Sequence, residues 1–250
     1  LPTSQQSLYA RTHPMSRDRV DTLEAKLKES PLKDKPLPAE WADQYARVKA
    51  KLIAFVSPQQ VMSLYPSSDT SIPARYARAI ASYRMNHMEA ANKEIDGLLV
   101  TEPNNPYFWE LKGQMLFSFG RTADSIKAYQ KAIDLEPSAG LIRIALAQAM
   151  IEGAGRKSQT LDAAIGHLKR AEKDEPRVSS VKRLLATAYG KMGKEAEARV
   201  YLAEEALMQG RRSEAARMAK ASIEQLPKTS PERIRASDIM NEVGDSDKKM

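Results

Sequence analysis

Apolar residues recur along most of the chain at intervals of three and four, the spacing that places them on one face of an α-helix. Residues 39–56 show this most clearly, with five large apolar side chains on one face: Trp41, Tyr45, Val48, Leu52 and Phe55. Residues 58–65 predict a short helix, and Pro-rich polar connections occupy residues 30–38 and 66–73. No segment alternates apolar and polar residues as a strand would. The pattern predicts an all-α fold.

An internal repeat organises the rest of the chain. Three segments end alike, in GLLVTEP, AIDLEP and AEKDEP, and their prolines are Pro103, Pro137 and Pro176. The second spacing between these prolines exceeds the first by five positions, and GAGRKSQ at 153–159 is the expected place of this insertion, in a turn between helices. The first spacing matches the period of about 34 residues, with two helices per unit, that is typical of the tetratricopeptide repeat. We therefore expect antiparallel helix pairs stacked into a superhelix.

The unit that ends at Pro137 fits this pattern best. Small residues at its signature positions allow two helices to approach closely, large ones fill the space around them, and the proline ends the second helix. The signature residues are Trp109, Gly113, Leu116, Ser125, Tyr129, Ala132 and Pro137. Lys112, Leu116 and Ser125 depart from the usual Leu, Tyr and Ala.

The neighbouring units repeat the pattern more loosely, as degenerate terminal repeats do. Residues in register before the middle unit are Ala79, Ala91, Ile95 and Leu98. Those after it are Leu146, Ala147, Met150, Ala164, Leu168, Ala171, Leu185, Ala186, Tyr189, Gly193, Ala198 and Leu202. Gly210, Ala215, Ala219 and Pro227 suggest one more helix pair, and residues 230–243 a last helix.

Composition narrows the possible functions. The net charge of +7 is small for a chain of this length and is spread along it, which argues against a nucleic-acid-binding surface. The absence of cysteine excludes disulfides and Cys-ligated metals. No apolar run in the sequence is long enough to predict a membrane-spanning helix.

Groups that could carry out catalysis are few. The three histidines, His13, His87 and His167, lack metal-ligand spacing, and there is no HExxH sequence. His87 is expected in a solvated turn and His167 at an exposed helical position. GAGRKS at 153–158 lacks the spacing of a phosphate-binding loop. We predict no catalytic residue, metal or cofactor in this chain.

A concave groove is the better candidate site, because repeats of this kind expose the first helix of each pair on the concave side. We expect a protein or peptide ligand with apolar anchors there. The predicted groove residues are Tyr76, Ile80, Tyr83, Arg84, Gln114, Phe117, Ile144, Gln148, Ile151, Arg183 and Lys191. The alternative is that they pack on a neighbouring domain of the same chain.

Residues 10–24, ARTHPMSRDRVDTLE, resemble the end of the catalytic domain in bacterial zinc metallopeptidases of the HtpX-like and BepA-like kind (metallopeptidase family 48). The resemblance rests on Thr12, His13 and Pro14 followed by Arg19 and Val20, and on the repeats that follow. It implies that His13 and Arg19 lie at the edge of a zinc cleft in a parent protein of the periplasm or cell envelope. Without an HExxH helix, this chain cannot bind catalytic zinc alone.

The sequence thus predicts a fragment with four parts. Residues 1–31 would be the tail of a missing metallopeptidase domain, 32–71 a helical linker, 72–243 the repeat domain and 244–250 a disordered tail. The repeats would recognise or dock unfolded or envelope-assembly proteins for the absent zinc-dependent domain. The alternative is a stand-alone repeat adaptor or scaffold with no enzyme attached.

Overall fold

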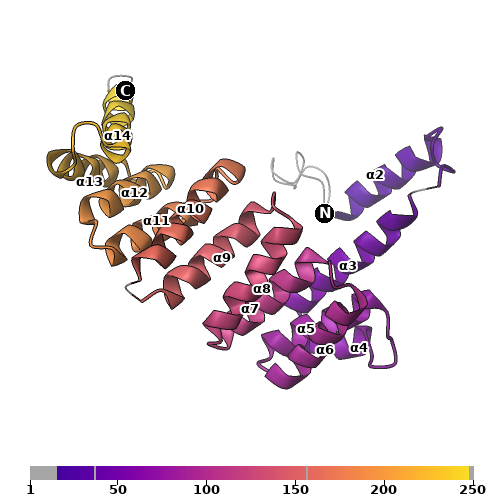
Figure 1. Ribbon diagram of the computed structural model, residues 1–250. Helices are drawn as coiled ribbons and strands as arrows, with labels where there is room; N and C mark the ends of the chain where they lie inside the picture. Colours follow the sequence, from indigo (N-terminus) through magenta and orange to yellow (C-terminus); the bar gives the residue numbers. More distant parts are fainter. Residues whose placement is uncertain (1–15, 37, 156, 248–250) are drawn as a thin grey trace. The chain divides into compact units, whose positions relative to one another are not determined.

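The computed structural model describes residues 16–36, 38–155 and 157–247, and these residues form thirteen α-helices, α2 to α14 (Figure 1). The predicted all-α fold is confirmed. The chain divides between Lys49 and Ala50 into two compact units. No helix within the described ranges is both long and apolar enough to cross a membrane.

The first unit contains α2 (Ser16–Glu29) and the beginning of α3 (Ala39–Val56). Both helices are amphipathic, yet their apolar faces are exposed. On α2 the exposed apolar side chains are Val20, Leu23 and Leu27, and on the first part of α3 they are Trp41, Tyr45 and Val48.

The end of α3 belongs to the second unit, where only part of the large apolar face of this helix is packed. Leu52 is exposed and Phe55 half-buried, whereas Ala50 and Ala54 are fully buried in the core. Small alanines let the helix approach its neighbours closely, and Ile53 and Phe55 pack beside them against the same core. The predicted short helix follows as a 3₁₀ turn (Pro58–Gln60) and α4 (Val61–Leu64).

The repeats form five consecutive helix pairs, and each helix from α5 to α14 contacts the next. The pairs are α5 (Ile72–Arg84) with α6 (Met88–Thr101), α7 (Pro106–Ser118) with α8 (Thr122–Leu135), α9 (Gly140–Gly153) with α10 (Ser158–Asp174), α11 (Ser180–Lys191) with α12 (Glu195–Met208), and α13 (Arg212–Gln225) with α14 (Pro231–Asp247). The first helix α9 also contacts the first helices on either side of it, α7 and α11. This arrangement is the predicted tetratricopeptide-like superhelix, and α14 runs four residues beyond the expected end at 243.

Local sequence sets where the helices begin and turn. Ser71 caps α5 by accepting a hydrogen bond from the Ala74 amide, and Asn105 caps α7 through the Tyr107 amide at 3.0 Å. Between paired helices the chain turns through a left-handed residue, Asn86 after α5 and Gly120 after α7. Gly and Asn adopt this conformation at the lowest cost, which explains their place at these turns.

The signature residues of the middle unit pack as expected. Gly113 of α7 lies against the ring of Tyr129 of α8, and a Cβ at position 113 would come within 2.8 Å of that ring. Ser125 and Ala132 are fully buried in the same helix pair. The absence of a side chain at Gly113 is therefore what lets α7 and α8 approach closely.

The five-residue insertion is not confined to a turn. Compared with the α7–α8 unit, α9 is one residue longer, the turn before α10 is one residue longer, and α10 is three residues longer. Most of the insertion thus extends a helix by nearly one turn, because additional backbone hydrogen bonds are satisfied more readily in a helix than in a long turn.

An ionic cluster joins the last repeats. Glu204 of α12 accepts hydrogen bonds from Lys182 of α11 at 2.6 Å and from Arg235 of α14 at 2.5 and 2.9 Å. Glu172 of α10 pairs with the same two cations. Hydrogen bonding to Glu204 raises the pKa of Arg235 above its usual value despite partial burial. The cluster connects four helices through four charged side chains.

Candidate functional site

Four of the eleven predicted groove residues lie in the core. Tyr76 and Ile80 of α5 are buried among the first repeats, and Ile144 and Ile151 of α9 are buried against α10 and α11. Burial raises the pKa of Tyr76 far above its usual value. The side chains of these residues pack the scaffold and are withdrawn from any ligand.

The other seven predicted residues are at least partly exposed on the first helices. They are Tyr83, Arg84, Gln114, Phe117, Gln148, Arg183 and Lys191. Several make polar contacts between helices: the Tyr83 hydroxyl lies 2.8 Å from the Ser118 hydroxyl, and Lys191 donates to the Ile151 carbonyl at 2.7 Å. Arg183 pairs with the buried Glu205 of α12. These seven residues are called the first-helix face below.

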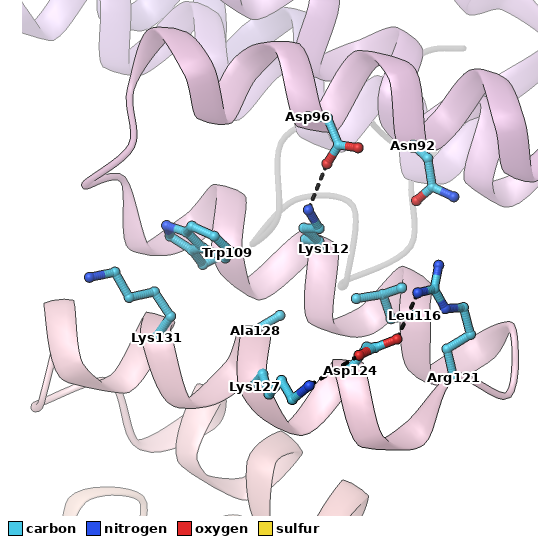
Figure 2. Close-up of a pocket in the computed structure, with 10 residues that line it drawn as sticks. All are labelled: Asn92, Asp96, Trp109, Lys112, Leu116, Arg121, Asp124, Lys127, Ala128 and Lys131. Carbon is cyan, nitrogen blue, oxygen red and sulfur yellow. Dashed lines mark hydrogen bonds and ion pairs between the residues drawn. The ribbon is translucent and has the colours of Figure 1, made fainter.

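A second feature, which the sequence reasoning missed, is a cavity of about 660 Å³ between α6, α7 and α8. Figure 2 shows Trp109 and Lys131 at one end, Asn92 and Arg121 at the other, and Leu116 and Ala128 between them. Asp96, Lys112, Asp124 and Lys127 complete the lining. None of these ten residues belongs to the first-helix face.

Ion pairs order this cavity. Lys112 of α7 donates to Asp96 of α6 at 2.7 Å, and Arg121 donates to Asp124 at 2.7 Å, with Lys127 3.5 Å from the same carboxylate. The hydrogen bond from Arg121 lowers the pKa of Asp124 below its ordinary value. Each of the two carboxylates thus lies beside a cation of the cavity.

The sequence does contain a signal for this cavity. Asp124, Lys127 and Lys131 recur at intervals of three and four residues and so share one face of the second helix. The face can be read from spacing, but its meeting with Trp109 and Asp96 depends on how three helices pack, which spacing within one helix does not give.

The two histidines that the structure describes, His87 and His167, do not belong to a group of side chains that could hold a metal ion. Within the described ranges no three His, Asp or Glu side chains gather in a way that could hold a metal ion. His87 is exposed at the start of α6, as expected for a solvated turn. His167, which was expected to be exposed, is half-buried, with Nδ1 3.5 Å from Arg143 of α9. His13 lies outside the described residues, whereas Arg19 is exposed on α2.

Comparisons with known proteins agree with the geometry. Residues 76–140 match the model of the tetratricopeptide repeat family. None of the curated proteins matches the chain.

Solved structures of low sequence identity share the fold. MamA MSR-1 is 18% identical, with a TM-score of 0.54 over 67% of this chain and 96% of that one. MamA AMB-1 is 19% identical, with a TM-score of 0.55 over 66% of this chain and 98% of that one. YrrB, described as a TPR protein with an unusual peptide-binding site, is 15% identical, with a TM-score of 0.54 over 70% and 90%.

Proposed function

We propose that this tetratricopeptide-repeat protein is a protein-binding adaptor that holds an extended polypeptide along its first-helix face. The observation that carries the proposal is the direct contact of α7 with α9 and of α9 with α11. These contacts make α7, α9 and α11 one continuous surface, which bears the exposed or half-buried side chains Gln114, Phe117, Gln148, Arg183 and Lys191. A continuous surface of this length suits an extended chain better than a compact small molecule.

The side chains on this face have complementary uses. Tyr83 and Phe117 are half-buried aromatics, which offer apolar contact area with little loss of rotamer freedom. Gln114 and Gln148 carry both donors and acceptors, so they can hydrogen-bond to the backbone of a ligand whatever its sequence. The similarity in fold to YrrB, whose title names a peptide-binding site, supports a polypeptide ligand.

Site-specific photo-crosslinking in the source cells tests the proposal. A photoreactive amino acid would replace Gln148 or Thr187, which are exposed on α9 and α11, and Asp162, which is exposed on α10, would serve as control. We expect one discrete crosslinked protein from positions 148 and 187 and none from 162. Equal crosslinking at all three positions, or none at the first two, would contradict the proposal.

A second candidate function joins the repeats to a zinc metallopeptidase. Its support is the segment Thr12-His13-Pro14 with Arg19 and Val20, which resembles the end of such a catalytic domain. In this version the repeats present unfolded or envelope-assembly proteins to a zinc-dependent domain in the periplasm or cell envelope. The comparisons support the adaptor more directly, because they concern the repeats alone.

The mass of the native protein separates the two candidates. An immunoblot of fractionated source cells with antibodies to this chain would show a band of about twice 27.8 kDa, in the envelope fraction, if a peptidase domain is attached. Zinc content and proteolysis would then be measured on that longer protein. A band near 27.8 kDa, the mass of this chain alone, would rule out the metallopeptidase and leave the adaptor.

A further inference from the structure

The cavity between α6, α7 and α8 has an apolar floor. Leu116 and Ala128 are only 4% and 3% exposed, so the half-buried indole of Trp109, at one end of the cavity (Figure 2), offers the main apolar surface to a ligand. The indole N–H donates to the Pro103 carbonyl at 2.8 Å, which fixes the ring in place. A fixed and partly exposed aromatic ring is a surface on which one apolar side chain of a ligand can be desolvated.

Cations outnumber carboxylates around this floor. The lining contains four cationic side chains, Lys112, Arg121, Lys127 and Lys131, against the two carboxylates Asp96 and Asp124. Both carboxylates already accept from cations of the cavity, so they offer little further attraction to a cationic ligand.

The cationic side chains of the cavity can still donate hydrogen bonds to a ligand. The side chain of Lys127 is 80% exposed, and Lys131 makes no ion pair with any residue that the structure describes. An ammonium has three donors and a guanidinium five, so Lys127, Lys131 and Arg121 can each bind a further anionic oxygen. The rim is therefore complementary to negative charge on both sides of an apolar centre.

We propose that this cavity is a second polypeptide-binding site, selective for an acidic segment that carries an apolar side chain. The apolar side chain would lie on the half-buried indole of Trp109, and flanking carboxylates would pair with Lys127, Lys131 and Arg121. The proposal rests on the proposed function only in that the ligand is a polypeptide, because the site shares no residue with the first-helix face. The apolar floor and the two fixed carboxylates disfavour a nucleic acid, whose backbone is uniformly anionic.

Trp109 supplies a direct measurement. The chain has two tryptophans, and Trp41 is more than half exposed, so Trp41→Phe leaves Trp109 as the one tryptophan of the chain at little cost. In that background, three twelve-residue peptides would be titrated: an acidic peptide with a central leucine, the same peptide with serine there, and a basic peptide with the leucine. A single-stranded oligonucleotide would be the fourth probe.

The expected result is saturable binding of the acidic leucine peptide with a shift of Trp109 emission to shorter wavelength. The serine and basic peptides and the oligonucleotide should bind at least tenfold more weakly. Equal binding of the oligonucleotide, or preference for the basic peptide, would overturn the proposal. So would the absence of binding by the acidic leucine peptide.

Charge-matched variants locate the site. The double substitution Lys127→Glu and Lys131→Glu reverses the charge of the cavity rim and should weaken binding of the acidic leucine peptide at least tenfold. Lys220→Glu with Lys228→Glu makes the same change in charge at exposed positions elsewhere, and Arg84→Glu with Lys191→Glu makes it on the first-helix face.

Both control pairs should retain binding within about twofold, the small change expected from screened, distant charge. If the acidic leucine peptide lost binding only in the Arg84→Glu, Lys191→Glu variant, the proposal of a second site would be overturned and the proposed function would be left intact. Equal loss of binding in all three double variants would show that the peptide is attracted by the net charge of the protein, and would also overturn the second site. None of these outcomes changes the result expected from photo-crosslinking at positions 148 and 187, which tests the first-helix face separately.

Discussion

The first repeats, α5 to α8, and the last, α10 to α14, pack the same helix pairs with different chemistry. In the first, Tyr76 and Phe108 lie with ring centroids 5.3 Å apart among fully buried aliphatic side chains such as Leu111 and Met115. In the last repeats, the ionic cluster of Glu172, Lys182, Glu204 and Arg235 joins four helices. The stacked rings of Tyr189 and Tyr201 belong to the same repeats.

The difference is one of balance, because the first repeats also contain the buried Arg78 of α5 paired with Glu94 of α6 at 2.8 Å, whereas the last repeats rely more heavily on charge. Apolar burial depends on volume and is largely indifferent to pH. A partly buried ionic cluster needs every member, because removing one leaves its partners without compensation in a poorly solvated place. Acid and single charge changes should therefore weaken the last repeats, and loss of volume should weaken the first.

Truncation of a core aromatic should have the largest effect. Phe108 is 1% exposed, so Phe108→Ala should lower the free energy of unfolding by about 3–5 kcal/mol through lost burial and the cavity left behind. Its neighbour Tyr107 is 55% exposed, and Tyr107→Ala should stay within about 0.5 kcal/mol. Urea unfolding followed by circular dichroism measures both. Equal losses would mean that the first repeats do not depend on buried volume.

Removal of one charge from the ionic cluster should rank second. Glu204→Gln leaves Lys182 and Arg235 facing each other with only Glu172 between them, and should cost about 2 kcal/mol, less than a fully buried pair because the cluster is partly solvated. Glu224→Gln, at an exposed position of α13, is the matched control and should change little. If Glu204→Gln behaves like this control, charge does not hold the last repeats together.

Substituting two glycines by alanine separates the effect of close packing on stability from the effect of helix propensity. A Cβ on Gly113 would meet the buried Tyr129 ring, so Gly113→Ala should destabilise the protein by about 1–2 kcal/mol. Gly166 of α10 has open space around it, and Gly166→Ala should stabilise by about 0.5–1 kcal/mol because alanine is the better helix former. Thermal unfolding of the two variants should shift in opposite directions, and shifts in the same direction would refute the packing argument.

Packing within a helix pair could be predicted from the sequence, whereas packing between repeats could not. Gly113, Tyr129 and the helix pairs were predictable, because contact within a pair is local and leaves a fixed pattern of small and large residues. Ile144 and Ile151 were assigned to the groove although they are core residues, because spacing on one helix does not say where the next repeat packs. The cavity beside Trp109 was missed for the same reason, since three helices from two repeats create it.

Acid should produce the smallest effect, beginning at His167, where α9 meets α10. Burial, and then the charge of Arg143, lowers the pKa of His167 below its usual 6.5. As pH falls through 6.5 the unfolded chain takes up a proton that the folded chain does not, so the stability that is fully present above 6.5 declines toward the folded pKa.

A second decline should follow in stronger acid. Burial opposes the charged form of Glu172, but hydrogen bonds from Lys182 and Arg235 outweigh it and lower its pKa below 4.5. The stability it contributes is present above 4.5 and is lost as pH falls through the folded pKa.

Urea midpoints between pH 8 and 3 test both steps. His167→Gln should remove the decline that begins at 6.5 while keeping the later one, and His87→Gln should keep both. Glu172→Gln should reduce the later decline without changing the early one, and the part that remains would come from other carboxylates with a lowered pKa, such as Asp124. An early decline that survives His167→Gln would mean that acid acts elsewhere in the fold and that His167 does not make the junction of α9 with α10 sensitive to pH.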